Sequence, residues 1–356
     1  MKRCWFLVLA AVLIGAMSSC ERGDHGRMGR TQAERTLRPA EVAALHDEPV
    51  WAYGFERPPR AGDVVKPQRP PARALRPGMS EAEQTRPRRV PGSSASYSLL
   101  DTYDDHNVID WFPQDHPPMP PVVQHGPAGM GALARGCAAC HLPNGKGRPE
   151  NAALAGLPVA YFLRQIEDFR AGRRHSCDPR KRNTPTMIGL AQGMTDAEAR
   201  AAAEYYGALP AAPWLRVVES DEAPAARLGG TVYIATGDGG TEPLAGRVLE
   251  VPEDATQSED LSNPRSGFVV YVSPASVARG RALATTCVAC HGAGLRGKDD
   301  IPPIAGRSPS YLARQLYDFR SGARRGSKAG LMQPVVARLS AADITDLAAY
   351  LVRVGN

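Results

Sequence analysis

The chain has 356 residues, and 43% of them are apolar, which is enough to build more than one buried core. Its formal net charge of +6 is unevenly distributed along the chain. Residues 1–96 hold 16 Lys or Arg against 10 Asp or Glu, whereas residues 97–356 hold 27 of each kind. A nucleic-acid-binding protein concentrates positive charge on its folded part, so this distribution argues against a nucleic-acid partner.

The N-terminus has the features of a bacterial export signal. Two cations at positions 2 and 3 precede an apolar run, residues 4–17, that is short for a membrane span. Two serines and a cysteine follow, and small residues before a cysteine resemble a lipoprotein cleavage site. We therefore predict a lipoprotein-type signal peptide over residues 1–20, a lipid on Cys20 and a periplasmic location at a bacterial membrane. Cleavage by an ordinary signal peptidase is the alternative.

Two segments with little helical periodicity follow the signal. Residues 21–96 are rich in Arg, Pro and Gly, which predicts a tether that is mostly disordered. The aromatic cluster at residues 51–55 is the exception, and we expect it to dock onto the folded body. In residues 97–127 the density of proline forbids a helix and predicts an ordered segment that wraps around the body.

From residue 128 onward the chain repeats itself. CAACH at 137–141 matches CVACH at 287–291, and the same offset of 150 residues aligns YFLRQIEDFRAG with YLARQLYDFRSG. The offset then falls to 145, because the first copy holds five extra residues in the stretch that contains Cys177. Apolar residues recur at helical spacing in both copies. We predict a mainly α fold with two helical domains in tandem, residues 128–212 and 276–356.

The stretch between the two copies, residues 213–275, has a different character. It contains β-prone runs such as Phe268–Val272, which are separated by Gly, Pro and Asp. We expect a small antiparallel sheet or a pair of hairpins that joins the two helical domains.

The motif CxxCH predicts a covalently bound haem. Two cysteines three residues apart in a helical turn face the same way, and each can form a thioether to one haem vinyl group. The adjacent histidine then lies beneath the iron as its proximal ligand. A zinc site would need further ligands nearby, and a redox dithiol would need a βαβ context. The sequence therefore predicts two haems, bound at Cys137, Cys140 and His141 and at Cys287, Cys290 and His291.

The sixth ligand of each iron is expected downstream of the motif. Thr195 and Ser340 begin matching capping boxes of the last helices, and Met187 and Met332 each lie eight residues before them. A lone methionine usually fills gaps in a core, but a methionine at the same place in both copies is better explained as an iron ligand. His175 is a rival in the first copy and has no counterpart in the second.

These motifs together resemble those of a known family. CxxCH, then Tyr-x-x-x-Gln-x-x-x-Phe-x-x-Gly, then Met followed by Leu-Ser-x-x-Asp and Ala-Ala-Tyr, is similar to the pattern of class I cytochromes c. Two such units in tandem resemble the dihaem cytochromes of the c-four type, over residues 128–209 and 276–354. The resemblance implies two all-helical domains, each with one low-spin haem held by His and Met. The long N-terminal region and the β-prone connector depart from the family.

With both axial positions occupied, a haem iron only exchanges electrons, and a methionine ligand raises its reduction potential. We predict a dihaem c-type cytochrome, not an enzyme, that carries electrons in the periplasm between a dehydrogenase or quinol-linked donor and a terminal acceptor. One alternative is an electron-transfer subunit dedicated to one dehydrogenase, with the β-prone connector as its docking surface. Another is a dihaem peroxidase or sulfur-oxyanion dehydrogenase with one open or labile haem. Its unusual ligand would come from residues 173–186, which include Cys177, or from His116 and His125.

Four arginines repeat at matched positions, and two interpretations of them stay open. They neutralise haem propionates, or they lie on solvated helix faces. Cys177 is interpreted as a loop thiol without a function. The four arginines are Arg164, Arg170, Arg314 and Arg320.

Overall fold

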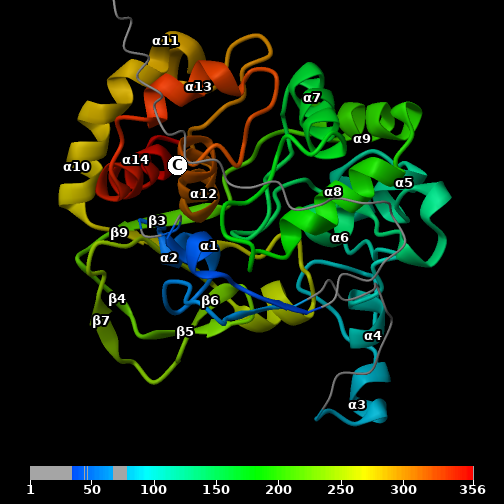
Figure 1. Ribbon diagram of the computed structural model, residues 1–356. Helices are drawn as coiled ribbons and strands as arrows, with labels where there is room; N and C mark the ends of the chain where they lie inside the picture. The colour runs from blue at the N-terminus through cyan, green and yellow to red at the C-terminus, as the bar shows by residue number, and fades with distance from the viewer. Residues whose placement is uncertain (1–33, 44, 46, 67–77, 356) are drawn as a thin grey trace, which may run out of the picture.

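The computed structural model describes residues 34–43, 45, 47–66 and 78–355, so the predicted signal peptide and Cys20 lie outside the described residues. Two helical units lie side by side, and a β-rich connector lies next to the second unit (Figure 1). This arrangement confirms the predicted mainly α fold with two helical units. Within the described ranges, no helix is long and apolar enough to cross a membrane.

The first unit contains α6 (Cys137–His141), α7 (Val159–Arg170), α8 (Asn183–Gly193) and α9 (Asp196–Ala208). α7 packs against α8 and α9, and its apolar side chains Phe162, Ile166 and Phe169 belong to the buried core. Thr195 accepts a hydrogen bond from the Glu198 amide at the start of α9, so the predicted capping box is confirmed.

The second unit contains α10 (Pro274–Leu283), α11 (Val288–His291), α12 (Pro309–Arg320), α13 (Ala329–Val336) and α14 (Ala341–Val354), with short 3-10 turns at Ala284–Cys287 and Ala293–Leu295. α14 packs against α10 and α12. Its predicted apolar stripe is buried, with Ile344, Leu347 and Leu351 at most 3% exposed. Ser340 begins this helix with the second predicted capping box.

The connector contains β3 (Leu215–Glu219), β4 (Glu222–Pro224), β5 (Ala226–Gly229), β6 (Val232–Ala235), β7 (Thr241–Pro243), β8 (Leu249–Pro252), a π-helical turn (Thr256–Asp260) and β9 (Phe268–Val272). β4 pairs with β7, and β5 with β6, in the antiparallel sense that was predicted. β9 pairs antiparallel with β8 but parallel with β3, so the connector contains one parallel pair that was not predicted. Both β3 and β9 run towards the second unit, and residues 220–267 form the long crossover that a parallel pair requires.

Part of the predicted tether is folded in the described residues. It contains β1 (Arg35–Thr36), α1 (Pro39–Ala43), α2 (Val50–Tyr53) and β2 (Val64–Val65), and β1 pairs with β2. We call residues 47–66 the strap. α2 of the strap packs against α12, and Tyr53 is 1% exposed, which confirms that the aromatic cluster docks. Residues 34–43, 45 and 47–66 differ from the disordered chain that was expected because Leu37, Leu45 and Ala52 are also buried.

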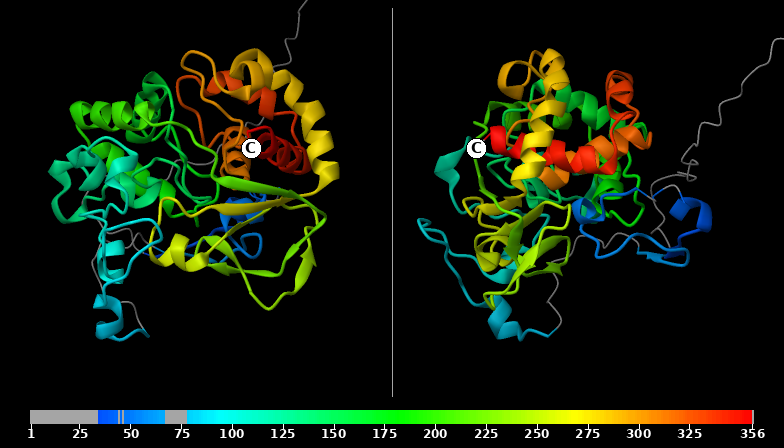
Figure 2. Two further views of the ribbon diagram at one scale, coloured as in Figure 1. Left: turned by 180° about the vertical axis from the view of Figure 1, so that it is seen from behind. Right: turned by 90° about the vertical axis from the view of Figure 1, so that its left-hand side faces the viewer.

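Residues 78–135, which we call the wrap, run from the connector to the first unit (Figure 2). At the connector, the indole N–H of Trp111 donates to the Leu261 carbonyl at 2.7 Å. At the first unit, α5 (Pro121–Gln124) packs against α6 and α9. The expectation that proline excludes helix from residues 97–127 is wrong for α4 (Leu99–Thr102) and for α5. In α5, Pro121 occupies the first helical position, where no amide hydrogen is needed. The wrap contains α3 (Glu81–Thr85), α4 (Leu99–Thr102), α5 (Pro121–Gln124) and 3-10 turns at Pro113–Asp115 and Ala128–Leu133.

Candidate haem sites

In each unit the histidine of CxxCH is buried, and a backbone carbonyl orients its ring. The Nδ1–H of His141 donates to the Ala152 carbonyl at 2.8 Å, and that of His291 donates to the Pro302 carbonyl at 2.9 Å. Burial lowers the pKa of His141 to about 4 and also lowers the pKa of His291, so both rings are neutral at pH 7. Because Nδ1 carries the proton, Nε2 keeps the lone pair that an iron ligand needs.

The two carbonyl acceptors were missed by the sequence reasoning. Ala152 and Pro302 each lie 11 residues after their histidine, at the same offset that relates the rest of the repeat. Neither side chain takes part in the bond, so residue type gave no signal. The constant spacing within the repeat was the signal that could have found them.

The four cysteines of the two motifs differ in exposure. Cys137, Cys140 and Cys287 are half-buried, whereas Cys290 is exposed. Burial raises the pKa of Cys137 to about 12 and that of Cys140 to about 11, and it also raises the pKa of Cys287. The Cys137 thiol donates to the Val122 carbonyl of the wrap at 3.3 Å. The wrap therefore contacts the attachment motif of the first unit directly.

Both predicted methionine ligands are half-buried on equivalent helices. Met187 lies on α8 and packs against the core of the first unit. Met332 lies on α13, where it shares a helical face with Ala329 and Val336, which are buried in the second unit. The structure therefore places one methionine in each unit on a helix that packs on the same unit as its CxxCH motif.

Met194 is a core residue, and His175 is a loop residue. Met194 is 6% exposed and belongs to the core of the first unit, as its place in the repeat predicts. The Nε2–H of His175 donates to the Gly172 carbonyl at 2.7 Å. The Nε2 atom of His175 therefore bonds to its own loop.

Comparison with known proteins settles the family. The sequence profile of the family described as Cytochrome c matches residues 128–208 and 277–355. Cytochrome c-554(548) of Halomonas halodenitrificans is 46% identical over 66 residues, which are 18% of this chain and 80% of that protein. The chain belongs to the cytochrome c family.

Two longer similarities extend over both units of this cytochrome. The thiosulfate dehydrogenase electron acceptor of Stutzerimonas stutzeri is 27% identical over 232 residues, which are 64% of this chain and 83% of that protein. Cytochrome c4 of Azotobacter vinelandii is 25% identical over 229 residues, which are 63% of this chain and 86% of that protein. This cytochrome is a tandem dihaem electron carrier with two covalently bound haem c groups, as the motifs predicted.

Buried cations fit the anionic edge of a haem. Lys181 Nζ, Arg182 Nε and Arg307 Nη2 are buried and have no hydrogen-bond partner within the part of the chain that the structure describes. Burial lowers the pKa of Lys181 to about 7. An unpaired buried cation is costly, and haem propionates are anions of the right chemistry to pair with it. The donors present therefore fit haem in this cytochrome.

The repeated Arg170 and Arg320 donate to backbone carbonyls of their own units. Arg170 donates to the carbonyls of Ala191 and Met194, at 3.2 and 2.9 Å. Arg320 donates to the Leu339 carbonyl at 2.8 Å. These acceptors lie at or just beyond the C-terminal ends of α8 and α13. Both arginines therefore stabilise the ends of the methionine-bearing helices.

The other two repeated arginines also have partners within the protein. Arg314 is 4% exposed and donates to the carbonyls of Ala52 and Pro149. Arg164 forms an ion pair with Asp300 of the second unit at 2.6 Å. Arg314 is therefore far from a solvated face, and Arg164 links the two units.

Two arginines that the sequence reasoning passed over form a symmetric junction between the units. Arg174 donates to Gln165 of its own unit at 3.0 Å, and to Gln315 of the other unit at 2.8 Å. It also reaches Tyr311 at 3.2 Å. Arg324, 150 residues later, makes the equivalent hydrogen bonds from the second unit to the first. Its partners are Gln315, Tyr161 and Gln165, at 2.9, 2.9 and 2.7 Å.

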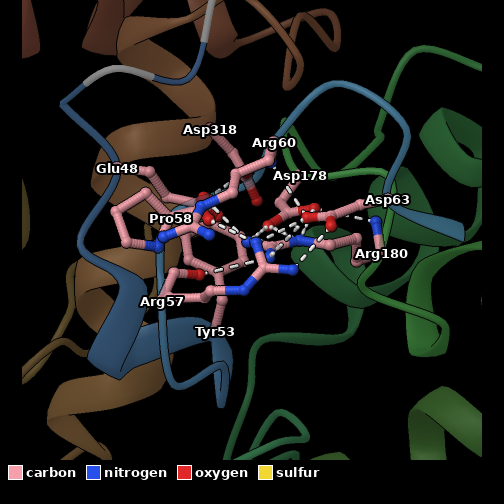
Figure 3. Close-up of polar contacts among 9 residues, drawn as sticks. All are labelled: Glu48, Tyr53, Arg57, Pro58, Arg60, Asp63, Asp178, Arg180 and Asp318. Atoms are coloured by element: carbon pink, nitrogen blue, oxygen red, sulfur yellow. Dashed lines mark hydrogen bonds and ion pairs between the residues drawn. The ribbon is translucent and has the colours of Figure 1, made fainter. Parts of the chain in front are cut away.

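A buried carboxylate cluster joins the strap to both units (Figure 3). Glu48 comes from the strap, Asp178 from the extra loop of the first unit and Asp318 from α12. Arg180 Nε donates to Asp178 Oδ2 at 2.9 Å, and its Nη2 lies 3.5 Å from Glu48 Oε2. The Tyr53 hydroxyl donates to Asp318 Oδ1 at 2.8 Å. The cluster therefore holds three segments that are far apart in the sequence.

The same cluster shifts the titration of its carboxyl groups. Burial, together with the neighbouring Asp178 carboxylate, raises the pKa of Glu48 to about 10. Burial raises the pKa of Asp318 to about 6, although the Cys177 amide and the Tyr53 hydroxyl donate to it. Glu48 is therefore protonated at neutral pH. Sequence reasoning missed Glu48, because it lies in the Arg- and Pro-rich segment that was predicted to be a tether.

Proposed function

We propose that each unit holds its haem iron between a histidine and a methionine. The observation that carries this proposal is the repeated ring orientation, in which Nδ1 of each histidine is bonded to a carbonyl and Nε2 is left for the iron. A methionine on the packed helix of the same unit supplies the opposite ligand. The axial pairs are His141 with Met187 and His291 with Met332, and the thioethers form at Cys137, Cys140, Cys287 and Cys290.

With this ligation the cytochrome transfers electrons and performs no substrate chemistry. Haem supplies the one-electron chemistry, and the protein holds it, tunes its potential and keeps both axial positions occupied. The other candidate ligands support this view. Both ring nitrogens of His116 have partners, since Nδ1 contacts the Pro117 carbonyl at 2.9 Å and Nε2 contacts Asp110 at 3.3 Å. His125 is exposed at the surface of the protein.

The proposal also includes the electron donor and the cellular location of the protein. The name of the Stutzerimonas stutzeri relative, a thiosulfate dehydrogenase electron acceptor, supports a dehydrogenase of sulfur compounds as the electron donor. The export signal and Cys20 support a periplasmic carrier held to a membrane by a lipid, with haem domains at residues 128–212 and 276–356. Mass spectrometry of the mature N-terminal peptide tests the anchor: an unmodified Cys20, or cleavage at another residue, contradicts it.

The ligation is tested by optical spectra of the purified holoprotein, oxidised and reduced, with carbon monoxide and with peroxide. The proposal expects two low-spin haems whose spectra change with neither reagent. Carbon monoxide binding at either iron would show an open or labile position. That result would replace the carrier with the dihaem enzyme.

A further inference from the structure

The two methionine-bearing helices are each supported by the helix that precedes them in the chain. α8, which carries Met187, packs against α7, and α13, which carries Met332, packs against α12. The supporting helices are equivalent elements of the repeat, since α12 begins and ends 150 residues after α7. Each methionine therefore depends on the same kind of support for its position.

The last residue of each supporting helix is an arginine, and it makes the same contact in both units. Nη2 of Arg170 donates to the Met194 carbonyl at 2.9 Å, and Nη1 of Arg320 donates to the Leu339 carbonyl at 2.8 Å. Each acceptor lies seven residues after the predicted methionine ligand and directly before the N-cap of the last helix. The bond recurs although Met194 and Leu339 differ in type, because the acceptor is a backbone atom.

This hydrogen bond joins the two ends of the segment that contains the methionine. The bonded residues are 24 apart in the sequence of the first unit and 19 apart in the second, and the methionine helix lies between them. The last carbonyls of a helix have no partner within it, and a cation at that end is favourable. The arginine therefore fixes the far end of the methionine helix to the helix that supports it.

The two units differ in how much of this fixation the arginine supplies. In the first unit, Arg170 also donates to the Ala191 carbonyl at 3.2 Å and pairs with Asp196 at 2.9 Å. In the second unit, the equivalent of Ala191 is Val336, and its carbonyl accepts a hydrogen bond from the Leu339 amide at 3.1 Å. The first methionine helix therefore relies on its arginine for more contacts than the second does.

We propose that Arg170 and Arg320 are positioning residues that keep Met187 and Met332 on the two irons. The inference rests on the proposed axial pairs of the two haems. Residues behind a metal ligand set its orientation and the strength of its bond, and each arginine acts in this way through the backbone of the methionine segment. Loss of one arginine should let a competing ligand bind its own iron more easily. That ligand bonds to the ferric iron as the methionine sulfur leaves, with no change of oxidation state.

The test measures how easily cyanide displaces each methionine from the oxidised holoprotein. Loss of the near-infrared methionine-to-iron charge-transfer band is followed as cyanide is added. In the Met332→His background only Met187 contributes to this band, and Arg170→Gln in that background should lower the cyanide concentration for half displacement by about ten-fold, because bonds from a charged donor are lost. In the Met187→His background, Arg320→Gln should lower it by about three-fold, since one carbonyl bond is lost there.

The matched controls exchange the arginines between the backgrounds. Arg320→Gln in the Met332→His background should leave displacement of Met187 within about two-fold, and so should Arg200→Gln, which removes the same charge from the exposed face of α9. Arg170→Lys keeps a cation at the helix end and should restore part of the resistance to cyanide. Equal shifts from Arg170→Gln and from the two controls would overturn the proposal, and so would no shift from Arg170→Gln.

Denaturant unfolding of the same holoproteins separates positioning from a general role in stability. If Arg170→Gln lowers the unfolding midpoint but leaves the cyanide concentration unchanged, the arginine is only structural and the proposal is overturned. The band of the wild-type protein reports the ligation separately. Its absence would overturn both the ligation and the role of the arginines, whereas a normal band with unshifted displacement in the variants would overturn the role of the arginines alone.

Discussion

The two haem units are repeats of one another, yet their surfaces beside CxxCH differ. In the first unit the wrap contacts α6, and Ala138 is 1% exposed. In the second unit Val288 occupies the same position and is 45% exposed. The repeated helices therefore determine where the haem ligands lie. The segments outside the repeat determine which motif meets the solvent.

The strap, like the wrap, lies outside the repeat, and it determines other contacts of the two units. It packs on α12 of the second unit and contributes Glu48 to a cluster with Asp178 and Asp318 (Figure 3). It thereby ties the extra loop of the first unit to the second unit. The added segments thus cover one attachment motif, leave the other exposed and hold the two haem units together.

Replacing one axial methionine should change the reduction potential of one haem only. Met332→His should lower the potential of the second haem by roughly 0.2 V, because methionine favours ferrous iron more than histidine does. Met187→His should shift the other haem by a similar amount. Optical redox titration of the two holoprotein variants measures this. A potential that does not change in a variant would contradict its methionine as ligand.

A carboxylate introduced into the buried part of the wrap should reduce the stability of the protein far more than one introduced at the exposed position in α11. Val123 lies in α5 of the wrap and is 0% exposed, so Val123→Asp should cost about 3 kcal/mol of stability by burying an unpaired charge. Val288→Asp, at an exposed site, should stay within about 0.5 kcal/mol of the wild type. Denaturant unfolding of the holoproteins compares them. Equal losses would show that the wrap does not cover the first motif.

The junction between the units should contribute less than the wrap. Arg324→Gln removes hydrogen bonds to Tyr161, Gln165 and Gln315, and should cost about 2 kcal/mol because the acceptors are left partly unpaired. Arg200→Gln, on the outer face of α9, is the control and should have little effect. If Arg324→Gln unfolds at the same denaturant concentration as the control, the junction does not hold the units together.

The carboxylate cluster predicts that the stability of the protein depends on pH. The pKa of Glu48 is raised to about 10 in the folded state, so the folded protein holds a proton that the unfolded chain loses above about pH 4.5. Its contribution to stability therefore falls as the pH rises from about 5 to 9, by at most about 1.4 kcal/mol per pH unit.

Glu48→Gln should flatten this fall, because glutamine does not titrate. Thermal unfolding of the holoprotein between pH 5 and 9 measures the effect, and Glu204→Gln on the surface of α9 is the control. An identical pH profile in Glu48→Gln and in the wild type would show that Glu48 is ionised in the folded protein.

The repeated helical units could be predicted from the sequence, but little of the rest of the molecule could. CxxCH, the capping boxes at Thr195 and Ser340 and the apolar stripe of α14 are local patterns, and the structure contains each of them. Local patterns are visible in one sequence because their partners are neighbours along the chain. This is why the helical units were predicted.

The contacts that join the units could not be predicted in this way. Tyr53 bonds to Asp318, 265 residues away, and neither residue lies in a pattern that signals the other. Arg314 was assigned either to propionates or to solvent, yet it is buried against Ala52 and Pro149. A buried arginine and an exposed one have the same sequence signature on a helix, so only the packing of the strap reveals the difference.

The ligation of the two irons is the central claim, and magnetic circular dichroism in the near-infrared tests it most directly. Oxidised His/Met haem has a methionine-to-iron charge-transfer band in that region. Met187→Ala and Met332→Ala should each retain about half of the wild-type intensity, and the double variant should retain none. A single variant that keeps the full intensity would contradict the assignment of its methionine.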